Sequence, residues 1–381
     1  MKKRKKQKFD LDEKILFKSL KDMNRIKTKK KHKRKKNNKN FLSFRYFIII
    51  LIFLVIIIIL FSLVKKLRFN NLSLNSKDEI IKPYIIAQKD FCENFNKYKN
   101  EKYENELILT NAKINELNFQ LYIFKDPGFL MVVFNKEGAF ETTISKNIIE
   151  ALKFYSSKKK IKNNKDIFIL DIGTNIGWYP SLLGRYGYTI LCFEAFEKNS
   201  YVSKKNYCYL NKESNVIIIN KGLGSKEKKC SYFTHLNNAG NGLVLCDNNG
   251  TLKDKSTSRY FIKDSEVEIT TLNTFMPYLS NKNIVLIKID IEGNELEALK
   301  GGKELITKYH VPFVVLEFTP ELLNAIGSDQ RELIHLFVDN GYKISLKSFL
   351  SKEFLNIDEF FIRAKSQVYC YFVHESIISL L

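Results

Sequence analysis

The clearest pattern in the chain is a series of short, largely apolar runs, each with an acidic residue at or near its end. Residues 167–170 lead into Asp171, residues 189–193 into Glu194, and residues 284–291 carry Asp290 close to their end. Continuous apolar runs of this length are typical of strands covered on both faces in a parallel sheet. Amphipathic segments separate the runs, so the pattern predicts an α/β fold with helices on both faces of the sheet.

A glycine-bearing turn follows the first of these strands. Gly173, Asn175 and Gly177 stand at alternate positions before an amphipathic segment that begins near Trp178. A strand, a tight turn and a helix start leave N–H groups pointing into a crevice, where nucleotide-like ligands bind. The dinucleotide fingerprint G-x-G-x-x-G requires glycine at positions 175 and 178, where this chain has asparagine and tryptophan. The spacing instead suits a smaller zwitterionic ligand such as S-adenosylmethionine (SAM).

Acidic and basic side chains gather at the ends of the predicted strands. Glu194, at the tip of the second strand, is placed to accept hydrogen bonds from a ribose. Lys288, Asp290 and Glu292 alternate onto one face of the strand at 284–291. Charges are costly inside a core and tolerable at the rim of a crevice. Asn294 and Glu297 have the spacing of a helix capping box.

Several of these segments resemble, in order, the motifs of the FkbM family of SAM-dependent methyltransferases. They are LDIGTNIGWY (170–179), FEAFEKN (193–199), KIDIEGNELEALKGG (288–302), VVLEFTPELL (314–323) and DNGYKI (339–344). The resemblance covers about residues 118–375. It implies a Rossmann-like seven-stranded methyltransferase sheet, SAM as methyl donor, and methylation of a hydroxyl on a sugar or related compound.

The resemblance also assigns roles to individual residues. It makes the first motif the cofactor loop and Glu194 the ribose ligand, so the expected cofactor-binding residues are Asp171, Gly173, Asn175, Gly177 and Glu194. Asn273 and Ala195 depart from residues that the family often has, aspartate and proline. A hydroxyl acceptor benefits from a general base. Asp290 and Glu292, with Lys288 beside them, are therefore the expected catalytic residues, with a salt-bridged strand end as the structural alternative.

The first quarter of the chain has a different composition. Residues 1–45 contain 20 Lys and Arg against 4 Asp and Glu, a net +16 of the whole chain's +22. Residues 46–64 carry no charge and would span roughly 28 Å as a helix, close to the ~30 Å core of a bilayer. This predicts a single transmembrane signal-anchor, for which a cleaved signal peptide is the alternative.

The charges that flank this segment predict its orientation. The twenty residues before it carry ten Lys or Arg, and the twenty after it carry five. The positive-inside rule then puts the tail in the cytosol and the rest on the lumenal side (Golgi or endoplasmic reticulum) or outside the cell. The basic charge of the tail is then accounted for by membrane topology, and nucleic acid is not expected as a partner. The predicted organisation is a tail (1–45), an anchor (46–64), a stem and helical lead-in (65–117), and a methyltransferase domain (118–381).

The remaining expectations concern cysteines and loops. The six cysteines include no C-x-x-C pair, and no histidine stands at metal spacing, so we expect no zinc site and assign no metal. Cys192 and Cys370 are expected in the core, and Cys230 with Cys246 is the most plausible disulfide in an oxidising compartment. Residues 221–255 are expected to form a polar loop.

Three functions fit the sequence. The favoured one is a membrane-anchored, lumen-facing O-methyltransferase acting on a glycan or another small hydroxyl compound. The second is the same fold acting on a lipid or a protein. The third is a catalytically silent binding module tethered to a membrane. The sequence does not identify the acceptor or the oligomeric state.

Overall fold

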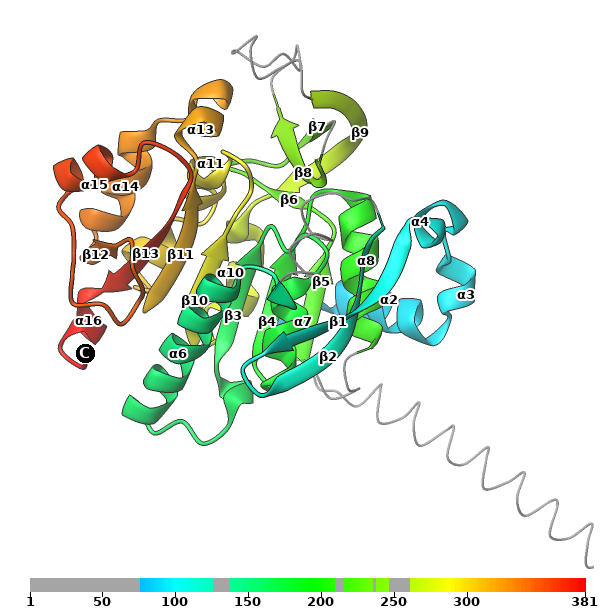
Figure 1. The fold of residues 1–381 in the computed structure, drawn as a ribbon, viewed down its shortest axis with the longest axis horizontal. Coiled ribbons are helices and arrows are strands. Elements are labelled where there is room, and N and C mark those ends of the chain that lie inside the picture. Colours follow the sequence, from blue (N-terminus) through cyan, green and yellow to red (C-terminus); the bar gives the residue numbers. More distant parts are fainter. Residues whose placement is uncertain (1–75, 126–136, 210–214, 236–237, 247–260) are drawn as a thin grey trace, which may run out of the picture. The chain divides into compact units, whose positions relative to one another are not determined.

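The structure, a computed structural model, describes residues 76–125, 137–209, 215–235, 238–246 and 261–381 (Figure 1). The predicted basic tail and the predicted membrane anchor at 46–64 lie outside these ranges. Within the described ranges, no helix is both long enough and apolar enough to cross a membrane.

A seven-stranded mixed sheet organises the described part of the chain (Figure 1). Its order is β12 (Tyr342–Ser345), β13 (Val368–His374), β11 (Phe313–Phe318), β10 (Ile284–Ile289), β3 (Phe168–Ile172), β4 (Thr189–Phe193) and β5 (Asn215–Ile219). Strand β13 is antiparallel to both of its neighbours, and the other pairs are parallel. The predicted seven-stranded Rossmann-like sheet is confirmed.

The apolar runs form strands because alternate side chains enter two different cores. Ile169 packs into one core, with α6 (Thr142–Lys158), α7 (Trp178–Arg185) and α8 (Glu197–Cys208). Phe168 and Leu170 pack into the other, with α10 (Leu272–Leu279), α11 (Glu295–Lys300), α12 (Glu304–Thr307) and α14 (Gln330–Val338). Helices therefore cover both faces, as predicted.

The strand order reverses direction at β3. From β3 the chain adds β4 and β5 on one side, and β10 then pairs with the other side of β3. Such a switch point opens a crevice at the carboxyl ends of the strands, which is where open α/β sheets bind ligands. The ends of β3, β4 and β10 are the positions at which the sequence places its acidic residues.

The segment before the sheet contains helices and a hairpin. It comprises η1 (Ser76–Asp78), α2 (Lys82–Glu93), α3 (Phe95–Tyr98), α4 (Glu101–Asn105), β1 (Leu107–Ile114) and β2 (Leu117–Phe124). Within the described part of the expected helical lead-in, helices extend to Asn105, and β1 forms a strand where a helix was expected. Strand β2 pairs with β1. A second alternating apolar run, FLMVVF at residues 129–134, is predicted from the sequence to form a strand beside it and lies outside the described residues. The domain boundary predicted at residue 118 therefore falls inside a hairpin.

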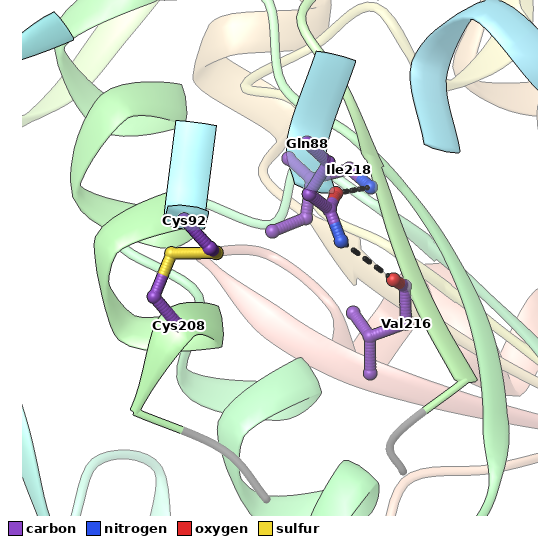
Figure 2. The surroundings of a disulfide bond; sticks show 5 residues. All are labelled: Gln88, Cys92, Cys208, Val216 and Ile218. Atoms are coloured by element: carbon purple, nitrogen blue, oxygen red, sulfur yellow. Dashed lines mark hydrogen bonds between the residues drawn. A yellow bond between two sulfur atoms is a disulfide. The ribbon is translucent and has the colours of Figure 1, made fainter. Parts of the chain in front are cut away.

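Helix α2 is attached to the edge of the sheet in two ways (Figure 2). A disulfide joins Cys92 to Cys208 at the end of α8, with 5.4 Å between the Cα atoms. The buried side chain of Gln88 donates to the carbonyl of Val216 at 2.7 Å and accepts from the N–H of Ile218 at 2.8 Å. Gln88 thus satisfies two backbone groups on the outer edge of β5, which would otherwise offer a pairing site to another chain.

A second sheet replaces the polar loop that was expected over residues 221–255. Its order is β6 (Gly222–Leu223), β9 (Phe261–Thr270), β7 (Lys228–His235) and β8 (Asn238–Leu245), and we call it the added sheet. A disulfide joins Cys230 in β7 to Cys246 just after β8, with 4.4 Å between the Cα atoms. This pair was predicted from the sequence. Cys192 and Cys370 are free and buried, as expected.

Candidate active site

The turn after β3 has a left-handed backbone at three alternate positions. The φ angles are +82° at Gly173, +51° at Asn175 and +84° at Gly177. A Cβ at Gly173 would lie 1.8 Å from the carbonyl oxygen of Asp290, so only glycine lets the turn approach the end of β10 this closely. Asparagine tolerates the left-handed region better than most residues. The spacing read from the sequence therefore reflects a backbone requirement.

Glu194 is buried directly beneath this turn. Its Oε2 accepts from the N–H of Asn175 at 2.7 Å, and its Oε1 accepts from the N–H of Phe196 at 2.9 Å. Burial raises the pKa of Glu194 to about 7, although the two amide donors pull it down. The carboxyl group thus ties the tip of β4 to the turn after β3 and retains lone pairs for a ligand.

A cavity of about 390 Å³ lies over the ends of β3, β4 and β10. Five of the eight predicted site residues line it: Gly173, Asn175, Glu194, Asp290 and Glu292. The volume is within the usual range for ligand and cofactor sites. The added sheet contributes to the wall through Tyr232, Gly242 and Val244, which sequence reasoning had placed in a loop.

The other three predicted site residues lie behind the cavity lining. Asp171 is fully buried within β3, and its Oδ2 accepts from the hydroxyl of Thr174 at 2.6 Å. Gly177 is packed against Ser203 of α8, which a Cβ would meet at 2.6 Å. Both residues shape the turn from below. Lys288 is also buried and contacts the lining residues Asp290 and Gly173.

Lys288 connects two parts of the site. Its Nζ lies 3.1 Å from Oδ2 of Asp290 and donates to the carbonyl of Gly173 at 3.1 Å. Burial alone would lower the pKa of Lys288, but the charges of Asp290, Asp171 and Glu141 outweigh burial and raise it. Lys288 therefore stays charged and holds Asp290 next to the turn. The pairing of Lys288 with Asp290 was expected from their spacing.

Three side chains that the sequence did not single out complete the site. Tyr369 of β13 donates to Oε1 of Glu141 and lies 3.3 Å from Oδ2 of Asp290. Tyr179 of α7 donates to Oε2 of Glu141. Glu141 precedes α6 with a left-handed φ of +45°. Such a φ is unusual for glutamate, but no local pattern in the sequence indicates that these three segments meet.

Carboxylates are concentrated on one side of the cavity. Asp290, Glu292 and Glu317 each bring an oxygen within 4.8 Å of the others. Burial raises the pKa of Glu292 to about 8 and also raises that of Glu317, and the charge of Asp290 adds to both shifts. Like charges this close share protons at neutral pH. A carboxylate cluster is not in itself a metal site, and we assign none.

The start of α11 differs in detail from the expected capping box. Asn294 makes no side-chain cap, and its Nδ2 instead donates to the carbonyl of Val244 at 3.1 Å. Glu295 takes over the capping role, because its Oε1 accepts from the N–H groups of Ile291 and Gly293 at 3.2 and 3.1 Å. The freed Asn294 thereby attaches the added sheet to the rim of the cavity.

The added sheet also gives the cavity an aromatic wall. The ring of Tyr232 stacks on that of Phe196, with 4.2 Å between the centroids and 9° between the planes. Tyr232 also covers Gly242, where a Cβ would lie 2.2 Å from the Tyr232 ring. A flat apolar surface beside Glu194 suits a nucleoside base next to its ribose.

Comparison with protein families gives a match over residues 171–344 to the methyltransferase FkbM domain. These residues form a methyltransferase FkbM domain. The resemblance noted in the sequence is thereby confirmed. The FkbM domain runs from Asp171 in β3 to Ile344 in β12 and includes every residue that was assigned a role from the motifs. Glu141 and Tyr369 lie outside the matched range.

Solved structures similar to this FkbM domain are distant. A crystal structure of monomeric WbdD is 12% identical, covers 72% of this chain and 48% of its own, and has a TM-score of 0.37. This chain therefore spans about half the length of WbdD. The structure of magnesium protoporphyrin IX methyltransferase (ChlM) from Synechocystis PCC 6803 with bound SAM is 11% identical and has a TM-score of 0.33. The match covers 80% of this chain and 100% of the ChlM chain. No curated protein matches the chain.

Proposed function

We propose that this protein is a SAM-dependent O-methyltransferase that acts on a hydroxyl of a glycan or another small compound. The observation that carries the proposal is the convergence of the glycine turn, Glu194 and Asp290 on one cavity at the switch point of the sheet. The first two suit a nucleoside. The third is a carboxylate held beside them by Lys288.

The residues around the cavity fit SAM by their chemistry. Glu194 is a fixed acceptor for ribose hydroxyls, and Tyr232, with Phe196 stacked on it, offers an aromatic ring at the cavity wall for the base. When bound, SAM supplies an electrophilic methyl group on a sulfonium. The protein's own task is then to position the acceptor and to remove its proton.

Asp290 is the side chain that we assign to proton removal. It lines the cavity, and Lys288 and Tyr369 both contact its Oδ2. The ion pair with Lys288 fixes the position of this carboxylate, and a carboxylate is the form of the side chain that accepts a proton. Glu292 lines the same cavity, but its raised pKa keeps it largely protonated at neutral pH, so we rank it second.

We further propose that residues 46–64 tether the domain to a membrane and that the domain faces the secretory lumen. The supporting observations are the uncharged stretch and the charge bias around it. The two disulfides in the described part of the chain suit an oxidising compartment.

The experiment is incubation of the purified protein with methyl-labelled SAM and separate glycan, lipid and protein fractions of secretory membranes. We expect label in the glycan or small-molecule fraction, as a base-stable ether. Asp290→Asn should still bind SAM in calorimetry, while turnover falls roughly 100- to 10,000-fold. Label in lipid or protein would reassign the acceptor. SAM binding without any transfer would indicate a silent binding module.

A further inference from the structure

The hydroxyl of Tyr369 lies between two carboxyl groups. It contacts Oε1 of Glu141 and, at 3.3 Å, Oδ2 of Asp290. A phenol has one proton, so it can donate fully to only one of the two groups. When it donates to one carboxylate, its oxygen can accept from the other carboxyl only if that carboxyl carries a proton. The hydrogen-bonded series Glu141–Tyr369–Asp290 (the line) can therefore hold its protons in two arrangements, which differ in the carboxyl group to which Tyr369 donates.

The two ends of this line differ in their surroundings. Asp290 faces the cavity and is paired with Lys288. Glu141 is paired with no cation in the described structure, and both its oxygens accept from tyrosine hydroxyls, those of Tyr179 and Tyr369. Burial raises the pKa of Glu141, the charge of Lys288 opposes this, and that of Asp290 adds to it. Burial therefore favours the neutral, protonated form of Glu141.

Other groups around the line stay in one protonation state. Burial, together with the charges of Asp290, Glu141 and Glu317, raises the pKa of Tyr369 well above its usual value. Tyr179 is raised similarly by burial and Glu141. Both phenols remain neutral, which lets Tyr369 exchange one proton for another without ever becoming charged.

Resting on the proposed function, we propose that Tyr369 and Glu141 form a proton relay behind Asp290. The methyl group moves from the sulfonium sulfur to the acceptor oxygen, and the electron pair of the broken S–C bond stays on sulfur. The acceptor's O–H bond breaks, and its proton passes to Asp290. Asp290 then gives a proton to the oxygen of Tyr369 as Tyr369 gives its own to Glu141. This leaves Asp290 ionised and Glu141 neutral, and Glu141 returns the proton to solvent.

The proposed relay returns Asp290 to its ion pair with Lys288 after each turnover. A proton on Asp290 would break its ion pair with Lys288 inside a site that already contains Glu292 and Glu317. Moving the proton to Glu141 restores that pair. Tyr369 and Glu141 are thus positioning residues that act through Asp290 and need not touch either substrate.

The test is Tyr369→Phe, with Tyr371→Phe as the matched control. Tyr371 lies two residues along the same strand and is likewise largely buried, but its hydroxyl accepts from Nδ2 of Asn147 at 3.0 Å. Each variant loses one phenol hydroxyl from the same face of β13. The full-length protein is assayed with methyl-labelled SAM and the fraction that the wild type labels, while SAM binding is measured by calorimetry.

We expect Tyr369→Phe to bind SAM within about twofold of the wild type and to lose turnover by roughly 10- to 100-fold. The loss should be partly recovered by raising the concentration of imidazole buffer, which can take the proton from Asp290 directly. Tyr371→Phe should show neither effect. Glu141→Gln, which keeps the shape but cannot take up the proton, should resemble Tyr369→Phe and provides the same test if that variant folds poorly.

Two outcomes would overturn the relay. One is turnover in Tyr369→Phe and Glu141→Gln equal to that of Tyr371→Phe. The other is a loss of turnover that buffer does not recover, which would indicate a purely structural role. A wild-type protein that neither binds SAM nor transfers methyl groups would instead refute the proposed function itself.

Discussion

Replacing Glu194 by alanine tests the cofactor assignment most directly. The carboxylate accepts from the amides of Asn175 and Phe196 and lines the cavity. A hydrogen bond to a charged group is worth about 1.5–3 kcal/mol. Loss of one such bond to a ribose hydroxyl should therefore weaken SAM binding by roughly 10- to 100-fold. Release of the Asn175 amide also loosens the turn, so the larger end of this range is expected.

The pH dependence of binding provides a second measure of the same group. Burial raises the pKa of Glu194 from 4.5 to about 7. Ribose hydroxyls donate to the ionised form, so SAM affinity should rise between pH 6 and pH 8 and level off above that. The sign for stability is opposite. A carboxyl group whose folded pKa is raised contributes most to stability below its unfolded pKa of 4.5, and the contribution is lost as pH rises through 7.

Calorimetry with SAM at pH 6, 7 and 8 measures the affinity for SAM and its dependence on pH. Glu297→Ala is the matched control. Glu297 lines the same cavity, but its Oε2 accepts a hydrogen bond from the hydroxyl of Ser225 at 2.6 Å, whereas Glu194 accepts from the turn after β3. We expect Glu297→Ala to keep wild-type affinity and its pH dependence, and Glu194→Ala to lose both. Wild-type affinity in Glu194→Ala at pH 8 would refute the ribose assignment.

Two further predictions concern the chain outside the cofactor site. If residues 46–64 anchor the protein with the domain in the lumen, protease added to sealed vesicles should spare the domain, and its digestion in intact vesicles would reverse the topology. The disulfides close loops of different length, with sequence separations of 116 for Cys92–Cys208 and 16 for Cys230–Cys246. In the chain-entropy account these stabilise the fold by about 5 and about 3 kcal/mol. Urea unfolding of the two double serine variants should give that order, and the reverse order would argue that α2 is not held by its disulfide.

The sequence predicted the parts of the fold whose signal is local. Strands β3, β4, β10 and β11 are buried on both faces, so their side chains form continuous apolar runs. The turn at Gly173 and Gly177 was recognisable because its backbone angles and close approaches restrict the residue type.

What the sequence missed depends on exposure and on distance along the chain. Strand β1 carries exposed polar residues between its apolar ones, and β7 begins with two lysines, so neither shows a strong strand pattern. The contact between Tyr369 and Glu141 joins residues 228 apart in sequence. No local periodicity reports such a contact, and it follows only from the position of β13 beside β11.

The position of β13 also affects how the protein is made. Strand β13 lies between β11 and β12 in space but follows both of them in the chain. Synthesis proceeds from the N-terminus at about 5–20 residues per second. Until β13 is synthesised, the edges of β11 and β12 that later pair with it have no partner strand. They cannot close on each other without excluding β13. Because β13 also carries Tyr369, the nascent chain can complete its cofactor turn before it has the tyrosine at Asp290. A ribosome-bound intermediate is thus expected to have its cofactor turn before the proposed relay is complete, with the edges of β11 and β12 that face β13 still open.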